Sequence, residues 1–263
     1  MLTAEQSAEF QELGYLVLPG ALSTEEVAVL DAAIDDLTAR PGPEVAREPE
    51  GTAHVVYGVH LFDERFGTLA HHPILANAAE QLLGQSFFVH QSRLNVKQTD
   101  GSVVVWHQDF ATYHRVDGIP EPRSLVIGVL LDDVTACNAP VVVIPRSHSL
   151  GIVSEAVIDE TVPDHGGAAR FRYDIPTTTM TRLVSDFGAD AILGPAGTLF
   201  FMHANLVHGS SVNIVPRRRA IAYINVSPCD NRGESFARPD YYAARDFSAV
   251  SAAETDCLLR LGG

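Results

Sequence analysis

An imidazole and a carboxylate stand two residues apart, at His107 and Asp109, at the end of the apolar run VVVWHQD. Side chains alternate along a β-strand, so both would point to one face, roughly 5–7 Å apart by strand rise. Such a pair can bind one metal ion. It can equally form a hydrogen-bonded pair or a polar strand end, so the HxD pattern needs a third ligand before it indicates a metal site.

His208 is the candidate third ligand. It comes after the strand-like run GTLFFMH and a short loop, and Gly209 follows it. Loops beside rigid strands often carry functional residues. Two histidines and one carboxylate are the facial triad of non-haem Fe(II) oxygenases, which leaves three coordination positions open. We interpret His203, at the end of that strand, and His148, in IPRSH, as structural.

A buried arginine is the second chemical signal. Arg219 lies eleven residues after the candidate ligand, at the start of the run RAIAYINV, and alternation places Arg219, Ile221 and Tyr223 on one face. A guanidinium on the inner face of an apolar strand needs an anion, and its planar fork suits a carboxylate. We therefore expect Arg219 to point inward, and Arg217 and Arg218 to be solvated.

The elements that position these residues divide into helices followed by strands. Two capping-box patterns, at Thr3 with Gln6 and at Ser23 with Glu26, begin short helices. From residue 86 onward, short β-rich runs alternate with turn signals, which indicates a sandwich or barrel such as a jelly roll. The fold class is mainly β with flanking helices.

One domain over 1–263 accounts for the whole pattern. Hydrophobic residues make up 46% of the chain, enough for one sizeable core. We expect a helix at 73–83 and an insertion at 151–190 with a helix around 178–187. The three parts of the domain are N-terminal helices over 1–85, a β core over 86–228 and a C-terminal tail over 229–263.

Charge and cysteine content restrict partners and compartment. The formal charge of −15 argues against nucleic acid and anionic membranes as main partners. The three cysteines, Cys137, Cys229 and Cys257, form no CxxC pair, which argues against a disulfide framework or a zinc knuckle. No apolar run approaches the roughly 20 residues of a membrane span. We expect a cytoplasmic protein with a small-molecule partner, as a monomer or a homodimer.

Together these motifs resemble the phytanoyl-CoA dioxygenase (PhyH) family. The resemblance rests on HxD at 107–109, on HGSSVN at 208–213 and on the arginine eleven residues after His208. The opening FQELGYLVLPGALSTEEV is also similar. The branch holding ectoine hydroxylases and the leucine hydroxylases of peptide antibiotic pathways is matched by HQSRLNVK, WHQDFATYHRVDGIPEPR, VLLDDVTACNAPVVVIPRSH and ARPDYYAARDF.

The resemblance implies a double-stranded β-helix (jelly roll, cupin-like) and a hydroxylase that uses Fe(II), 2-oxoglutarate and O₂. Arg219 would hold the distal carboxylate of 2-oxoglutarate, and Gln91 and Asn95 would flank cosubstrate and substrate. Thr112 and Tyr113 would meet the substrate. The implied metal ligands are His107, Asp109 and His208.

Substrate identity is less constrained. Relatives of the branch act on small zwitterionic molecules, which favours a free L-amino acid or a small derivative from specialised metabolism. Arg123 and Arg245 are candidates for holding its carboxylate, and both could equally be surface salt-bridge partners. The alternatives are late-stage tailoring of a larger natural-product intermediate, a non-catalytic cupin-like metal-binding module and, less favoured, a zinc hydrolase.

Several positions depart from the ectoine hydroxylase pattern. Gln108 stands where those enzymes usually carry serine, and Tyr113 where they carry tryptophan. Gln108 is shared with the leucine hydroxylases. Ala139 and Arg146 each occupy a position that is usually glycine. These changes make ectoine itself doubtful as the substrate.

Overall fold

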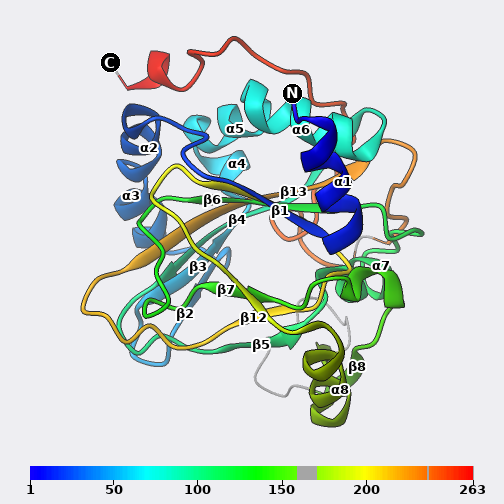
Figure 1. Cartoon of the computed structure of the whole chain (residues 1–263). Helices are drawn as coiled ribbons and strands as arrows, with labels where there is room; N and C mark the ends of the chain where they lie inside the picture. Colours follow the sequence, from blue (N-terminus) through cyan, green and yellow to red (C-terminus); the bar gives the residue numbers. More distant parts are fainter. Residues whose placement is uncertain (159–170, 236, 263) are drawn as a thin grey trace.

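The computed structural model describes residues 1–158, 171–235 and 237–262 (Figure 1). Two antiparallel sheets face each other in these residues. The strand order of the larger sheet is β1 (Tyr15–Leu18), β11 (Leu199–His203), β6 (Leu125–Leu130), β13 (Arg219–Pro228), β4 (Phe87–Lys97), β3 (Ala53–Tyr57) and β2 (Val45–Arg47). That of the smaller sheet is β10 (Asp190–Ile192), β7 (Val141–Val143), β12 (His208–Ser210) and β5 (Val104–His107).

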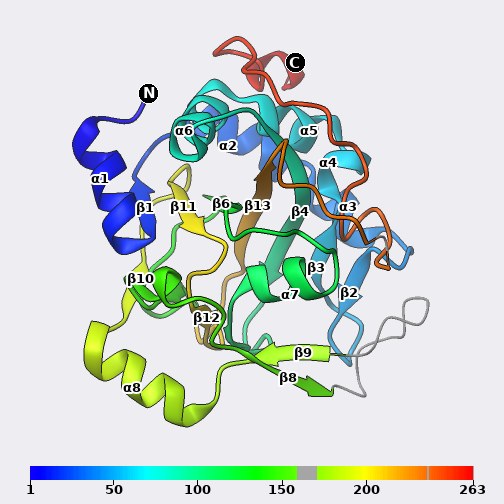
Figure 2. The same cartoon turned by 90° about the vertical axis from the view of Figure 1, so that its right-hand side faces the viewer.

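Helices cover the outer face of the larger sheet (Figures 1 and 2). The Thr3–Gln6 capping box begins the first helix and a left-handed Gly14 ends it, as expected. The helix predicted at 73–83 is present. The helices are α1 (Ala4–Leu13), α2 (Thr24–Asp31), α3 (Ile34–Ala39), α4 (Val59–Phe62), α5 (Glu64–His71), α6 (Pro73–Leu83), α7 (Asp109–Arg115) and α8 (Thr177–Phe187), with 3₁₀ turns at Ser147–Leu150 and Leu259–Leu261.

The N-terminal third is less purely helical than expected. The helical pattern that begins at Ser23 is split into α2 and α3 at Ala32 and Ala33. Strands β2 and β3 and helices α4 and α5 were not predicted. The third strand exists because it pairs with β4, with Val55 opposite Asn95, and a tertiary pairing of this kind leaves little local signal.

The insertion is partly described. Its predicted helix is α8, one residue longer than expected at its N-terminal end. Before it, β8 (Glu155–Ile158) and β9 (Phe171–Asp174) form a two-stranded hairpin, and the part of the insertion at 159–170 lies outside the described residues. Among the described residues, no helix is long and apolar enough to cross a membrane.

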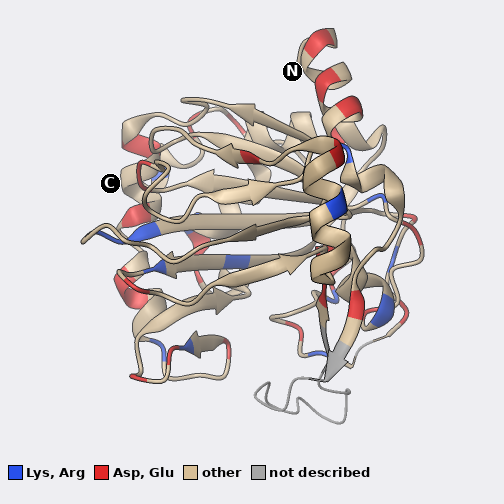
Figure 3. Cartoon of the chain, turned by 60° about the horizontal axis from the view of Figure 1, so that its bottom comes forward, with Lys and Arg blue, Asp and Glu red and all other residues tan. Residues whose placement is uncertain are grey.

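The two longest strands, β4 and β13, separate an apolar face from a polar one. Residues such as Leu94, Ala222 and Ile224 pack beneath the helices. The opposite face looks toward the smaller sheet and carries polar and charged side chains. Figure 3 shows basic positions on the central strands, while many acidic positions lie on outer helices and loops. The inner residues of the two strands include Gln91, Arg93, Asn95, Lys97, Arg219 and Tyr223.

A β-bulge interrupts β4 at His90. The pairing with β13 passes from Asn225 opposite Gln91 to Val226 opposite Val89, so His90 has no partner of its own. Beyond the bulge, Phe87 and Val89 join the helix-facing core. The extra residue therefore lets two consecutive side chains, His90 and Gln91, face the inner side.

Candidate active site

A cavity of about 520 Å³ lies between the two sheets. Its walls come from the inner faces of β4 and β13, from β5 and β12 of the smaller sheet, and from the first turns of α7. The two sets of functional residues expected from the sequence both line this cavity. They are the three candidate metal ligands and the guanidinium of Arg219.

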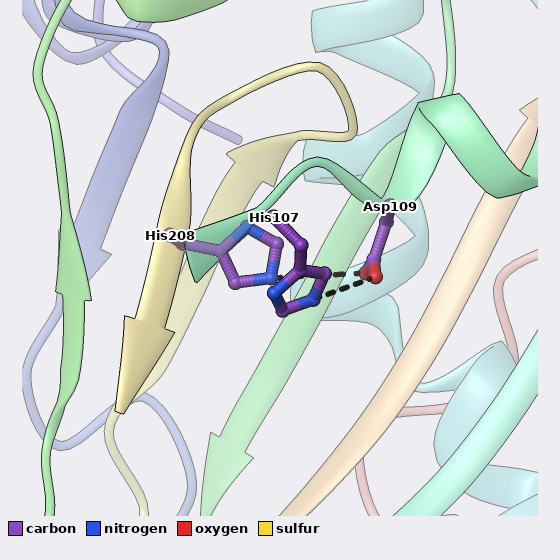
Figure 4. A group of neighbouring side chains, drawn as sticks. All are labelled: His107, Asp109 and His208. Atoms are coloured by element: carbon purple, nitrogen blue, oxygen red, sulfur yellow. Dashed lines mark ion pairs between the residues drawn. The ribbon is translucent and has the colours of Figure 1, made fainter. Parts of the chain in front are cut away.

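The three candidate ligands converge (Figure 4). One ligand atom from each of His107, Asp109 and His208 lies within 4.8 Å of the other two. His107 Nε2 is 3.3 Å from Asp109 Oδ1, and His208 Nε2 is 4.0 Å from Asp109 Oδ2. His107 and His208 are direct cross-strand partners in β5 and β12, which brings their ring centres to 4.2 Å with the ring planes tilted by 49°.

The carboxylate reaches this point by a different route from the one predicted. We expected His107 and Asp109 to share one face of a strand, and that is wrong. The strand β5 ends at His107, Gln108 occupies the N-cap position, and Asp109 is the first residue of α7. The strand-to-helix turn swings Asp109 toward His107, and a negative charge in the first turn of a helix is favoured by the helix dipole.

Both imidazoles are fixed in the orientation that a metal needs. His107 Nδ1 lies 2.8 Å from the carbonyl oxygen of Val105, and His208 Nδ1 lies 2.9 Å from that of Leu206. A carbonyl can only accept, so each Nδ1 carries the hydrogen and each Nε2 presents its lone pair beside Asp109. Metal-binding histidines are held in this way by partners outside the metal site. The donor set and its orientation fit a divalent transition metal.

Arg93 controls the charge of the carboxylate. Its Nη2 donates to Asp109 Oδ2 at 3.1 Å, and its guanidinium lies 4.6 Å from the centre of the Tyr223 ring. Burial would raise the pKa of Asp109, but Arg93 together with His107 and His208 holds that pKa well below its usual value. Burial and the neighbouring His107 lower the pKa of His208 to about 4. At neutral pH the site therefore presents an ionised carboxylate and a neutral His208.

Arg219 and Lys97 form a cationic end of the cavity, called here the dication end. They face each other across β13 and β4. Arg219 is 2% exposed; its Nη2 donates to the carbonyl of Ala139 at 2.8 Å, and its Nε has no hydrogen-bond partner. Lys97 Nζ donates to Ser210 Oγ at 2.9 Å. Burial and the adjacent Arg219 lower the pKa of Lys97 to about 8. Neither cation forms an ion pair with any described residue.

A fourth cation, Arg238, lines the cavity elsewhere and, like Arg93, is already paired with a carboxylate. Its Nε donates to Asp117 Oδ1 at 2.8 Å, and its Nη2 donates to the other oxygen of that carboxylate. His90 Nε2 lies 3.0 Å from Asp117 Oδ2. Nearby, Asn225 Nδ2 donates to the hydroxyl of Tyr113. We call this set of residues the paired end.

The structure brings some predicted site residues to the cavity and leaves others outside. Gln91, Asn95, Thr112 and Tyr113 line it together with the triad and Arg219. Two predicted substrate contacts are elsewhere. Arg123 pairs with Glu121 at 2.7 Å and with Asp230 at 3.0 Å, and Arg245 is exposed.

Three cations of the cavity, Arg93, Lys97 and Arg238, were not among the predicted site residues. The first two had a readable signal, because polar residues recur at every second position of β4 from Gln91 to Lys97. Arg238 carried none in its local sequence. In the fold it pairs with Asp117, which lies far away along the chain.

Comparison with known proteins agrees with this geometry. The family model described as phytanoyl-CoA dioxygenase (PhyH) matches residues 10–221. The chain belongs to the phytanoyl-CoA dioxygenase family. L-Proline trans-4-hydroxylase of Streptomyces griseoviridis is 36% identical over 252 residues, covering 93% of this chain and 94% of that protein. Ectoine dioxygenase of Bordetella parapertussis is 34% identical over 264 residues, covering 95% and 85%.

A solved structure has the same architecture. EctD from S. alaskensis, crystallised with 2-oxoglutarate and 5-hydroxyectoine, superposes with a TM-score of 0.82 at 32% identity, covering 96% of this chain and 87% of that one. The expected family and its cupin-like jelly-roll fold are thus confirmed.

Two departures from the family's motifs have a structural explanation. Ala139 and Arg146, which replace usual glycines, have φ values of 60° and 64°. This left-handed region favours glycine because other side chains are strained there. Both turns therefore hold a residue with a side chain in a conformation that suits glycine better. At Ala139 the turn matters for the site, because its carbonyl accepts from Arg219.

Proposed function

We propose that this chain hydroxylates an unactivated C–H bond of a free L-amino acid or a small amino acid derivative. Its reaction class is that of an Fe(II)- and 2-oxoglutarate-dependent dioxygenase. The observation that carries the proposal is the coexistence, in one cavity, of a His–Asp–His triad and a buried arginine without a carboxylate partner. The similarity to a protein named L-proline trans-4-hydroxylase supports the substrate class.

The dication end suits 2-oxoglutarate, which is a dianion with a carboxylate at each end. Burying an unpaired charge is costly, so Arg219 with its unpartnered Nε is best explained as the site of an anion. A guanidinium and an ammonium on neighbouring strands can bind the distal carboxylate together. The keto acid end would then lie toward the triad, whose residues His107, Asp109 and His208 would hold Fe(II).

The paired end suits an amino acid substrate. The guanidinium of Arg238 still has hydrogens that Asp117 does not take, and these can bind a carboxylate. We therefore propose Arg238, in place of Arg123 or Arg245, as the partner of the substrate carboxylate. Thr112 and Tyr113 lie on α7 immediately after the metal motif and would contact the body of the substrate.

The role of this chain's residues is to bind, orient and exclude water. Fe(II) and 2-oxoglutarate, when bound, supply the activation of O₂ for hydroxylation. Asp109 stays ionised because Arg93 stabilises its charge, and both histidines keep Nε2 free because backbone carbonyls hold Nδ1. Tyr57, Tyr113 and Tyr223 give the cavity largely buried aromatic walls, which keep bulk water from the substrate C–H bond.

An activity panel tests the proposal. Purified protein would be incubated with Fe(II), 2-oxoglutarate and single L-amino acids, with L-proline among them, and succinate and the oxidised product would be measured. At least one amino acid should raise succinate well above the uncoupled background and gain one oxygen atom. The proposed substrate class fails if none does, while Asp109→Asn serves as the inactive control.

A larger natural-product intermediate is the second candidate substrate. Val103, Val104 and Val105 line the cavity and are 56%, 38% and 39% exposed, so an apolar rim is available for a bulky ligand. Anaerobic spectroscopy distinguishes the proposed enzyme from a non-catalytic module that only binds metal. Fe(II) with 2-oxoglutarate should give a weak visible charge-transfer band if the keto acid chelates the metal, and none if the module only binds metal.

We also propose a cytoplasmic enzyme with small-molecule partners. The acidic net charge of −15 supports the absence of nucleic acid and membrane partners. Cys137, Cys229 and Cys257 are free thiols, in keeping with a reducing compartment. Whether the chain is a monomer or a homodimer stays a prediction, which size-exclusion chromatography with light scattering would decide.

A further inference from the structure

We infer that Gln108 is a positioning residue that holds the base of the β8–β9 hairpin, and with it Tyr173, against the cavity. The inference rests on the proposed function, because it assigns Tyr173 to the substrate side of that site. Gln108 is the middle residue of the HxD motif, and its side chain bonds to Asn205 and to residues 151–154.

The amide of Gln108 is fully engaged. The residue is 1% exposed. Its Nε2 donates to the carbonyl oxygens of Asn205 at 2.7 Å and of Gly151 at 2.9 Å. Its Oε1 accepts from the backbone N–H groups of Val153 at 2.8 Å and Ser154 at 3.2 Å. The donor and the acceptor of this side chain are thus both bonded to backbone groups of two other segments.

These bonds tie together three segments that are distant in sequence. One is the metal motif itself. The second is the loop before His208, because Asn205 stands three positions ahead of it and its own Nδ2 donates to the carbonyls of His148 and Gly151, both at 2.9 Å. The third is residues 151–154, which lead directly into β8.

The other arm of the hairpin is fastened to the same motif. The backbone N–H of Ile175, just after β9, donates to the carbonyl of Trp106 at 3.2 Å. The guanidinium of Arg115 lies 4.8 Å from the centre of the Tyr173 ring and donates to the carbonyl of Ser154 at 3.3 Å. Figure 2 shows the hairpin below α7, the helix that carries Arg115.

Tyr173 is where this arrangement meets the cavity. It is 7% exposed and lines the cavity that also holds the triad. Both arms of the hairpin that carries it are bonded to residues 106–115, so its position depends on the metal motif. Gln108 thus acts on the substrate side of the cavity through this hairpin.

The identity of residue 108 matters for this role. Serine, the residue usual at this position in ectoine hydroxylases, is too short to reach two segments at once. Glutamate has the same length and keeps the acceptor for Val153 and Ser154, but it sets a carboxylate against the carbonyls of Asn205 and Gly151. We therefore expect Gln108→Ser to release the hairpin base and Gln108→Glu to loosen it partly.

The first test uses the metal-free chain and needs no substrate. Hydrogen exchange would be followed at the amide of Ile175, which Gln108 does not contact. Gln108→Ser should speed that exchange about tenfold and Gln108→Glu by less. Trp106, the chain's single tryptophan, packs in the same cluster as Val153 and reports the hairpin base by fluorescence. Its quenching by acrylamide should rise about twofold in Gln108→Ser.

Asn231→Ser is the matched control. Asn231 is also a fully buried amide that bridges two segments, at Glu121 and at Ser227 of β13, and it does not line the cavity. The control should lower the melting temperature without changing Trp106 quenching or Ile175 exchange. If Gln108→Ser and Gln108→Glu behave like the control, Gln108 only packs, and the inference is overturned.

The second test uses an amino acid that is active in the panel. Gln108→Ser and Tyr173→Ala should each raise the KM for that amino acid about tenfold and leave the KM for 2-oxoglutarate within twofold. Their double variant should be little worse than either alone, because both changes remove the same contact. Additive effects would contradict coupling through the hairpin. The exchange and quenching tests require neither Fe(II) nor turnover, so they stand or fall independently of the proposed reaction.

Discussion

The dication end and the paired end of the cavity both present arginine, but only one of them has its charge balanced by the protein. Arg219 and Lys97 have no carboxylate partner among the described residues, whereas Arg238 is held by both oxygens of Asp117. Both guanidinium groups are largely buried. The difference lies in what the fold supplies as a counter-charge.

This contrast indicates what each end binds. An unbalanced buried cation is destabilising until an anion arrives, so the dication end favours a ligand with net negative charge. The paired end has little net charge to offset and offers directed hydrogen bonds from a fixed guanidinium and from polar side chains. It therefore suits a ligand that is neutral overall, as a zwitterionic amino acid is.

The largest expected effect comes from the triad that serves both ends. Asp109→Asn should abolish amino-acid-dependent succinate formation, by at least about 10³-fold, because partners outside the metal site alone typically contribute 10–100-fold. Asparagine preserves the acceptor for Arg93, so the fold should remain intact. Circular dichroism and Zn²⁺ titration of the metal-free protein check the fold and the lost metal affinity. Activity within tenfold of wild type would show that this carboxylate is not a ligand.

Replacing each of the two arginines in a separate variant tests which substrate each end of the cavity binds. Arg219→Gln should raise the KM for 2-oxoglutarate by about 10–150-fold, since hydrogen bonds to charged groups contribute about 1.5–3 kcal/mol. Arg238→Gln should act on the KM for the amino acid and spare that for 2-oxoglutarate. Steady-state kinetics with each substrate varied in turn measures both. The assignment of the two ends is reversed if the effects appear on the opposite substrates.

The pKa of Lys97 predicts a pH dependence that is confined to the dication end. Burial lowers that pKa to about 8, so Lys97 is mostly charged at pH 7 and loses its charge as the pH rises through 8. The KM for 2-oxoglutarate should therefore increase above pH 8, by up to about tenfold per pH unit. It should be flat from pH 7 to 9 in Lys97→Met. A wild-type KM that does not change over this range would remove Lys97 from the binding site.

The smallest effect concerns the turn that supports Arg219. Ala139→Gly should raise the free energy of unfolding by a few tenths to about 1 kcal/mol, because glycine adopts the left-handed conformation without strain. Urea denaturation measures it, and kinetic constants should not change. A loss of stability would mean that the methyl group of Ala139, which is 1% exposed, contributes more by packing than it costs in strain.

The residue types and their spacing were enough to predict the triad and the inward arginine, because those arguments depend on chemistry and on strand alternation. Arg219, Ile221 and Tyr223 do share the inner face. Strand alternation was the wrong reason for Asp109. The chain turns from strand to helix at Gln108, and the local sequence has no glycine or proline to announce that turn.

The parts that were missed depend on long-range contacts. Arg123 looked as available as Arg238 in the sequence, and only the fold shows that Glu121 and Asp230 hold the first on the surface while Asp117 draws the second inward. Strand β3 likewise depends on its pairing with β4. A sequence pattern that spans only a few residues does not indicate contacts between residues that are distant in the chain.

The β-bulge at His90, which has no cross-strand partner in β13, also limits how β4 can change in length. Deleting it would restore regular alternation and turn either Phe87 and Val89 or Gln91 and Arg93 to the wrong face. An insertion would do the same. A substitution in this strand changes one side chain. A single-residue deletion would instead reverse the facing of several side chains, and it would disrupt either the core or the wall of the active site. We expect functional members of a randomised library to keep residues 87–97 free of gaps.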